Sequence, residues 1–191
     1  RRLGIGADGL LLLREVDEGN VLFRVFNADG TEAELCGNGL RCAAAYWCSR
    51  SGGTHVEMQS VVGRHVADVR KRTDKSFDVQ MTLVPVKVGD TVQLEWGSRH
   101  ETVHVVHTGN PHAIILDASD AMVEQLSEIA ARVAAMDCFG GINVHLARAD
   151  GAMRAHMWSW GRGVGLVSAC ATGAAAVAKL VAGNAAGSVH I

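Results

Sequence analysis

Glu34-Leu35-Cys36-Gly37-Asn38-Gly39 lies in the first half of this chain, and Ser168-Ala169-Cys170-Ala171-Thr172-Gly173-Ala174 lies in the second. Both stretches place a cysteine among very small residues at the predicted start of a helix. Free backbone N–H groups and the positive end of the helix dipole meet at such a position, which favours a thiolate and can also hold a carboxylate. The two stretches therefore predict a matched pair of acid–base thiols.

Similar elements are expected around each cysteine. The expected strands cover 10–14, 21–26, parts of 56–84, 103–107, 113–116, 142–146 and 153–158, and the expected helices cover 39–48, 119–136 and 174–181. Strands, a loop, a cysteine and a nearly uncharged helix thus occur twice. This order predicts an α+β protein of two similar domains, 1–84 and 85–191, joined near Pro85–Asp90.

The composition is that of an ordinary globular protein. The chain has 191 residues, of which 48% are hydrophobic and 20% charged, and its formal net charge is −2. This balance gives no basic field for nucleic acid, and we see no apolar run long enough for a membrane span. The five cysteines have no regular spacing, which favours reduced thiols in a cytoplasmic compartment over a disulfide framework.

Several polar residues in predicted loops are further candidates for a binding site. They are Asn27, Asn110, His112, Asn143 and Arg162. An asparagine in a turn more often serves the backbone than a ligand, whereas a catalytic and a structural role are about equally favoured for His112.

The remaining cysteines and histidines give no comparable signal. We expect Cys42, Cys48 and Cys138 to pack in the interior, as free cysteines usually do. The other histidines are scattered without the spacing of metal ligands, so no metal site is expected.

Two thiols on opposite sides of one carbon could invert its configuration. A thiolate removes a proton from one face while the opposing thiol delivers another, and no cofactor is needed. Small residues beside each cysteine would let backbone N–H groups approach the substrate carboxylate and stabilise the negative charge that develops there.

The motifs as a set resemble those of the diaminopimelate epimerase family over almost the whole chain. The matching stretches are Gly4–Gly9, Phe26–Cys42, Gly109–His112, Ile142–Val144, Arg162–Gly165 and Ala169–Ala174, in the family's order. The motif around Cys36 is specific, and the one around Cys170 is looser.

This resemblance implies a homodimeric, pyridoxal-phosphate-independent epimerase. Each of its two domains would be a mixed β-sheet wrapped around a central helix, with the active site in the cleft between them. Cys36 and Cys170 would be the acid–base pair, and His112 would partner Cys36. The residues implied to hold the amino acid are Asn27, Gly37, Asn38, Asn110, Asn143, Arg162, Ala171 and Thr172. The implied reaction converts LL-diaminopimelate to the meso form for lysine biosynthesis.

Some positions depart from the family pattern. Gly161 stands where the family has glutamate, Leu166 and Val167 replace Glu-Thr, and Ala171 replaces glycine. The family's first strand and its last strands have no counterpart, so the sequence looks truncated at both ends. These departures leave open a racemase of another amino acid, or a catalytically impaired homologue that only binds a ligand.

Overall fold

The computed structural model describes residues 7, 9–17, 19–136, 141–151, 153–183 and 188–191. Most of the Gly4–Gly9 motif and Cys138 lie outside these residues. The chain divides into two compact units, Arg1–Val84 and Pro85–Ile191, called unit 1 and unit 2 below. No helix among the described residues is long and apolar enough to cross a membrane.

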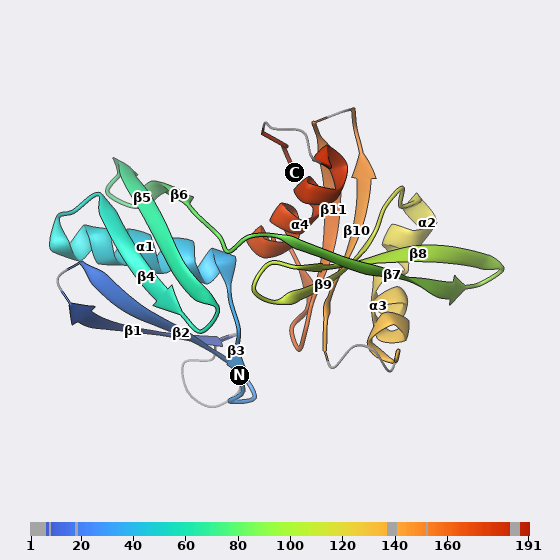
Figure 1. Ribbon diagram of the computed structural model, residues 1–191, viewed down its shortest axis with the longest axis horizontal. Coiled ribbons are helices and arrows are strands. Elements are labelled where there is room, and N and C mark those ends of the chain that lie inside the picture. The colour runs from blue at the N-terminus through green and yellow to red at the C-terminus, as the bar shows by residue number, and fades with distance from the viewer. Residues whose placement is uncertain (1–6, 8, 18, 137–140, 152, 184–187) are drawn as a thin grey trace. The chain divides into compact units, whose positions relative to one another are not determined.

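The described residues of unit 1 form a mixed sheet and one helix, which Figure 1 shows packed against each other. Its elements are β1 (Gly9–Asp17), β2 (Asn20–Asn27), β3 (Glu32–Ala33), α1 (Gly37–Ser51), β4 (His55–Ser60), β5 (Gly63–Thr73) and β6 (Ser76–Met81). The strand order is β1-β2-β4-β5-β6, and the short β3 also pairs with β2. β2 and β4 are parallel, so α1 serves as the crossover that a parallel pair requires.

The core of unit 1 lies between α1 and the sheet. Leu40, Ala43 and Ala44 of α1 are fully buried and pack with Phe23 and Met58. The small alanine side chains allow the helix to lie close to the strands. Because most of its surface is buried there, the helix carries few charged residues. The helix ends at Gly52, whose φ of 75° suits glycine. Cys42 is exposed on α1, so the expectation that it packs in the interior was wrong.

In unit 2 the part of the chain that the structure describes also forms a mixed sheet, with three helices. Its elements are β7 (Lys87–Trp96), β8 (Arg99–His107), β9 (Pro111–Ile115), α2 (Asp120–Glu124), α3 (Leu126–Ala134), β10 (Asn143–Ala149), β11 (Ala155–Gly161), β12 (Gly165–Val167) and α4 (Ala171–Ala182). The strand order is β12-β11-β10-β9-β8-β7, and only β9 and β10 form a parallel pair in this order.

The sheet of unit 2 has helices on both faces (Figure 1). Alternation along β9 separates them: Ala113 and Ile115 belong to the core with α2 and α3, whereas Ile114 packs with Ala176 and Val177 of α4. The side chains that share the face of Ile114 therefore lie toward α4.

Two features of unit 2 differ from the sequence expectation. The single helix over 119–136 is broken at Gln125, whose φ of −105° and ψ of 17° end α2 before α3 begins. Neither glycine nor proline marks this break. Unit 2 begins at Pro85, the first residue of the expected junction, but β7, which starts at Lys87, was not expected: its first half is solvent-exposed and therefore lacks an apolar pattern.

The internal repeat expected from the sequence is confirmed in its topology. In unit 1, β2 pairs with the short antiparallel β3, α1 follows, and β4 returns parallel to β2. In unit 2, β11 pairs with the short antiparallel β12, α4 follows, and a bridge at His190 runs parallel to Arg154, just before β11. Two mixed sheets, each with a cysteine-capped helix, are thus built on one plan.

Candidate functional site

Cys36 and Cys170 occupy the same position in the two units, the N-cap of α1 and of α4. Cys36 has φ −129° and ψ 102°, and Cys170 has φ −139° and ψ 104°. The Gly39 N–H donates to Cys36 Sγ at 3.2 Å, and the Gly173 N–H donates to Cys170 Sγ at 3.3 Å. Both sulfurs are half-buried. Each thiol thus sits at the N-terminus of a helix, where backbone N–H groups and the positive end of the helix dipole meet.

A row of polar side chains crosses the face of the unit 2 sheet that packs against α4. Ser159 on β11 lies directly opposite His145 on β10, and its Oγ is 2.9 Å from His145 Nδ1. His145 Nε2 is 2.8 Å from His112 Nδ1, and His112 Nε2 is 3.1 Å from Asn110 Oδ1. All four side chains are buried. Alternation along three neighbouring strands therefore gathers residues that are far apart in the sequence.

The direction of each hydrogen bond in this row follows from the amide oxygen of Asn110, which ends the row. Since the amide oxygen of Asn110 can only accept, His112 carries its proton on Nε2 and its Nδ1 accepts. His145 must then donate from Nε2, and its Nδ1 accepts from the Ser159 hydroxyl. The row is satisfied with both imidazoles neutral, and no buried polar side-chain atom of the described residues lacks a partner.

The electrostatics agree with neutral rings. Burial lowers the pKa of His112 to about 3, with further lowering by the neighbouring His145 and His107. Burial also lowers the pKa of His145 to about 4. Neither ring is therefore cationic near neutral pH.

Cys170 lies beside these histidines. One donor atom from each of His112, His145 and Cys170 lies within 4.8 Å of the other two. An ideal β-carbon on Gly173 would be 2.6 Å from His145 Nε2, so the missing side chain leaves space for the ring against the first turn of α4. Cys170 Sγ is also 3.5 Å from Thr172 Oγ1, and Thr172 is buried. His112, His145 and Cys170 thus offer three donor atoms that could hold a metal ion.

Asn143 and Arg162 join the neighbouring loops of unit 2. Asn143 Nδ2 donates to the Pro111 carbonyl at 3.2 Å, and Asn143 Oδ1 accepts from the Arg162 backbone N–H at 3.0 Å. The Arg162 guanidinium donates to the Gly141 carbonyl at 3.2 Å. Asn143 is therefore held beside the strand that begins with Pro111 and His112.

The candidates of unit 1 gather around the start of α1. Gly37 and Asn38 form its first turn, directly after Cys36. Asn27 ends β2, where its Nδ2 donates to Thr31 Oγ1 at 3.0 Å. His112 is a residue of unit 2, with both ring nitrogens bonded there, and its partnership with Cys36 stays a prediction.

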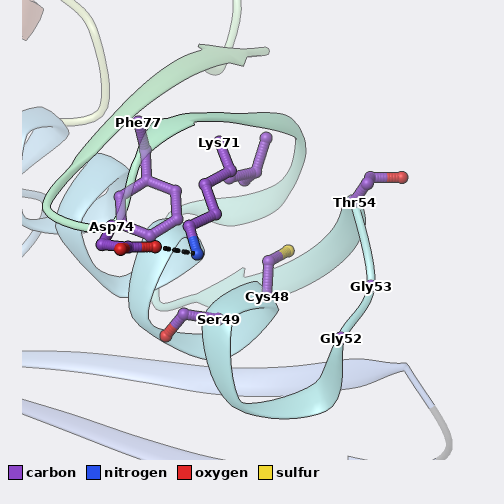
Figure 2. A pocket seen from close by; sticks show the side chains of 9 residues that line it. Cys48, Ser49, Gly52, Gly53, Thr54, Lys71, Asp74 and Phe77 are labelled. Carbon is purple, nitrogen blue, oxygen red and sulfur yellow. Dashed lines mark ion pairs between the residues drawn. The ribbon is translucent and has the colours of Figure 1, made fainter.

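A separate pocket of about 510 Å³ lies at the other end of α1. Figure 2 shows Cys48 among its lining side chains, together with Phe77 and the Lys71–Asp74 ion pair, whose Nζ and Oδ1 are 2.8 Å apart. Burial raises the pKa of the Cys48 thiol, so it stays protonated, as expected of a packing residue. Cys48 lies twelve residues after Cys36 along α1, and this pocket is distinct from the helix start.

His145 and Ser159 are the site residues that sequence reasoning missed. Their strands are recognisable, but a histidine on a strand becomes informative only when the facing element is known. The usable signal is alternation, because Val144 and Leu146 belong to the opposite core and leave His145 on the face of the cysteine-capped helix.

Known proteins resemble this chain at the level of sequence. The family model for diaminopimelate epimerase matches residues 1–87. Diaminopimelate epimerase of Carboxydothermus hydrogenoformans is 32% identical over 96% of this chain and 70% of its own length. The enzyme of Desulforudis audaxviator is 31% identical over the whole chain and 74% of its own length.

Solved structures show the same fold at lower identity. A hydroxyproline epimerase from Agrobacterium vitis matches with a TM-score of 0.69 and 19% identity, over 93% of this chain and 60% of its own. A PhzF-family phenazine biosynthesis protein from Bacillus anthracis matches with a TM-score of 0.67 and 12% identity, over 91% of this chain and 65% of its own. This chain thus spans less than two thirds of these structures. Its two cysteine-capped helices and its identity to these sequence relatives together show that the chain belongs to the diaminopimelate epimerase family.

Proposed function

We propose that this protein epimerises the α-carbon of LL-diaminopimelate to give the meso form, with Cys36 and Cys170 as the acid–base pair. The observation that carries the proposal is the matched N-cap geometry of the two cysteines, each with an N–H bond to sulfur. Family membership supports a small amino-acid substrate. The place of the reaction would be lysine biosynthesis in the cytoplasm, by a homodimer.

The chemistry needs one thiolate and one thiol on opposite sides of the α-carbon. The thiolate removes the α-proton, the opposing thiol donates its own, and the configuration inverts while the two sulfurs exchange protonation states. Negative charge develops on the substrate carboxylate during this step. N–H groups of the first turns of α1 and α4 are suited to stabilise that charge, because the helix dipole adds to their hydrogen bonds. This mechanism uses no cofactor.

The roles of the other candidates are part of the same proposal. The residues proposed to hold the substrate are Asn27, Gly37, Asn38, Asn110, Asn143, Arg162, Ala171 and Thr172. His112 would hold or accept the proton of Cys36.

Proton exchange with solvent tests the proposal. The protein is incubated in deuterated water with LL-diaminopimelate, and the product is analysed for deuterium at the α-carbon and for the meso isomer. We expect both in the unaltered protein. In Cys36→Ser and in Cys170→Ser we expect no accumulation of the meso product. Cys42→Ser is the matched control, because Cys42 lies exposed on α1, and it should keep full activity.

The same assay separates the alternatives. A panel of other amino acids is included, since a racemase of another substrate would incorporate deuterium into that substrate alone. A homologue that only binds would incorporate no deuterium into any of them. Activity that survives Cys36→Ser or Cys170→Ser would show that the substituted cysteine is structural.

A further inference from the structure

We propose that Cys170, His112 and His145 form a binding site for a thiophilic divalent cation, and that Zn²⁺ is the cation that fits these donors best. Two nitrogens and one sulfur are the donor types that Zn²⁺ prefers over Mg²⁺ or Ca²⁺, which take oxygen ligands. One donor atom of each residue already lies within 4.8 Å of the other two. A solvent molecule would complete a tetrahedral set, since Cys170 is half-buried and reaches the surface.

The geometry needs a small adjustment. Zn–N distances of about 2.0–2.1 Å and Zn–S distances of about 2.3 Å place tetrahedral donors roughly 3.3–3.6 Å apart. His112 Nδ1 and His145 Nε2 are 2.8 Å apart and joined by a proton, so the rings must separate by roughly half an ångström and tilt until both lone pairs point at the ion. Cys170 closes the remaining distance by a rotation about its side-chain bond. Gly173 favours this movement because it presents no side chain to His145.

The groups around the donors are those of a metal site. Metal-binding histidines donate their outer N–H to an oxygen that fixes the ring. His112 already donates from Nε2 to Asn110 Oδ1, and Ser159 Oγ lies 2.9 Å from the outer nitrogen of His145.

The proton balance is simple. His145 loses the proton on Nε2 and gains one on Nδ1, so the ring remains neutral. The new Nδ1–H donates a hydrogen bond to the Ser159 oxygen, and the Ser159 hydroxyl hydrogen turns away from the ring. His112 keeps its proton on Nε2 and offers Nδ1. The Cys170 thiol gives its proton to solvent, and about one proton is released for each cation bound when the thiol starts protonated.

Cobalt titration tests the site directly. Co²⁺ is added to the full chain, and absorption is followed for the thiolate-to-cobalt band and the strong visible bands of tetrahedral cobalt. We expect one ion per chain with both signals, and displacement of the cobalt by Zn²⁺. Cys170→Ser should abolish the thiolate band. This variant retains a good N-cap residue and should fold.

Matched variants define the donor set. Cys36→Ser should leave the titration unchanged, since Cys36 has the same cap geometry but belongs to no such donor group among the described residues. Ser159→Ala keeps all three ligands and should weaken binding about 10-fold or more, as loss of an outer partner does. A thiolate band that persists in Cys170→Ser, or disappears in Cys36→Ser, would overturn the proposal, as would the absence of any band.

An activity measurement adds a consequence that rests on the proposed function. If Cys170 transfers protons, bound Zn²⁺ occupies it, and epimerisation should stop at one equivalent and return when a chelator is added. Activity that persists while the visible cobalt bands show that the site is filled with Co²⁺ would contradict the role of Cys170 in epimerisation. It would leave the metal site standing, because the cobalt bands are read without substrate.

Discussion

Nδ1 of His112 accepts a hydrogen bond from Nε2 of His145 across 2.8 Å, and both rings are fully buried on the face of the unit 2 sheet that packs against α4. Both rings are neutral in this arrangement, and burial opposes the addition of a further proton to the pair. This relationship makes the folding of unit 2 sensitive to pH and fixes the position of the protons next to Cys170.

The first prediction is a loss of stability in mild acid. The pKa of His112 is lowered to about 3 and that of His145 to about 4, against an ordinary value of 6.5. The unfolded chain therefore binds these protons at a higher pH than the folded chain. The free energy of unfolding is at its full value above about pH 6.5 and falls as the pH drops toward the folded values. We expect a loss on the order of 2 kcal/mol per imidazole by about pH 5.

Urea denaturation near pH 7.5 and near pH 5 measures this loss. The control is the double variant His112→Gln/His145→Gln, in which the loss should be smaller. His65 in unit 1 also has a lowered pKa because of burial, and it contributes in the same direction in both proteins. Equal losses in the two proteins would show that the pair does not carry the effect.

The second prediction concerns the protons themselves. The row from Ser159 to Asn110 requires both histidines to carry their proton on Nε2. Nitrogen NMR of the imidazole rings distinguishes the two tautomers and should show Nε2–H for both near neutral pH. Ser159→Ala should disturb the His145 signal more than the His112 signal. A predominant Nδ1–H form at either ring would refute the assigned directions.

The sequence predicted the cysteine-capped helices correctly because local chemistry determines them. Small residues around Cys36 and Cys170 and an uncharged apolar run after each are sufficient to indicate a buried helix start. The expected start of the helix after Cys170 was residue 174, about one turn too late, because α4 begins at Ala171. End positions of helices depend on capping bonds that a pattern shows poorly.

The arrangement of His145 could not be predicted from local pattern, because it depends on register. His145 faces α4 only through the parallel pairing of β9 with β10 and the antiparallel pairing of β10 with β11. A shift of one residue would turn it to the other face. The break at Gln125 is similar, since the apolar spacing from Met122 to Val133 continues across it and gives no sign of two helices.

The third prediction tests the space beside His145. A β-carbon on Gly173 would lie 2.5 Å from Cε1 and 2.6 Å from Nε2 of His145. That ring is held at both nitrogens, so Gly173→Ala should displace it and cost about 1–3 kcal/mol of stability. Thermal or urea unfolding gives the cost, and nitrogen NMR should show the His145 tautomer signal disturbed.

Gly39→Ala is the matched control for this prediction. Its β-carbon would meet Leu11 Cδ2 at 2.9 Å, the end of a flexible side chain that can move, and would lie 3.2 Å from Cys36 Sγ and 3.3 Å from Cys36 Cβ. The gain in helix propensity, up to about 1 kcal/mol for alanine over glycine, opposes the remaining crowding. Similar costs for the two substitutions would mean that the His145 ring has more freedom than its hydrogen bonds indicate.

The last prediction separates the chemical role of the two cysteines from their structural role as helix caps. Each sulfur accepts an N–H bond in the first turn of its helix, from Gly39 or from Gly173. A serine hydroxyl can accept the same bond, whereas alanine cannot. Cys36→Ala and Cys170→Ala should therefore each lose about 1 kcal/mol relative to the corresponding serine variants. Urea denaturation of the four proteins measures the difference. If the alanine and serine variants are equally stable, the N–H bonds to sulfur contribute nothing to the caps. If the difference is found, a serine variant that folds normally and lacks epimerase activity has lost only its thiol chemistry.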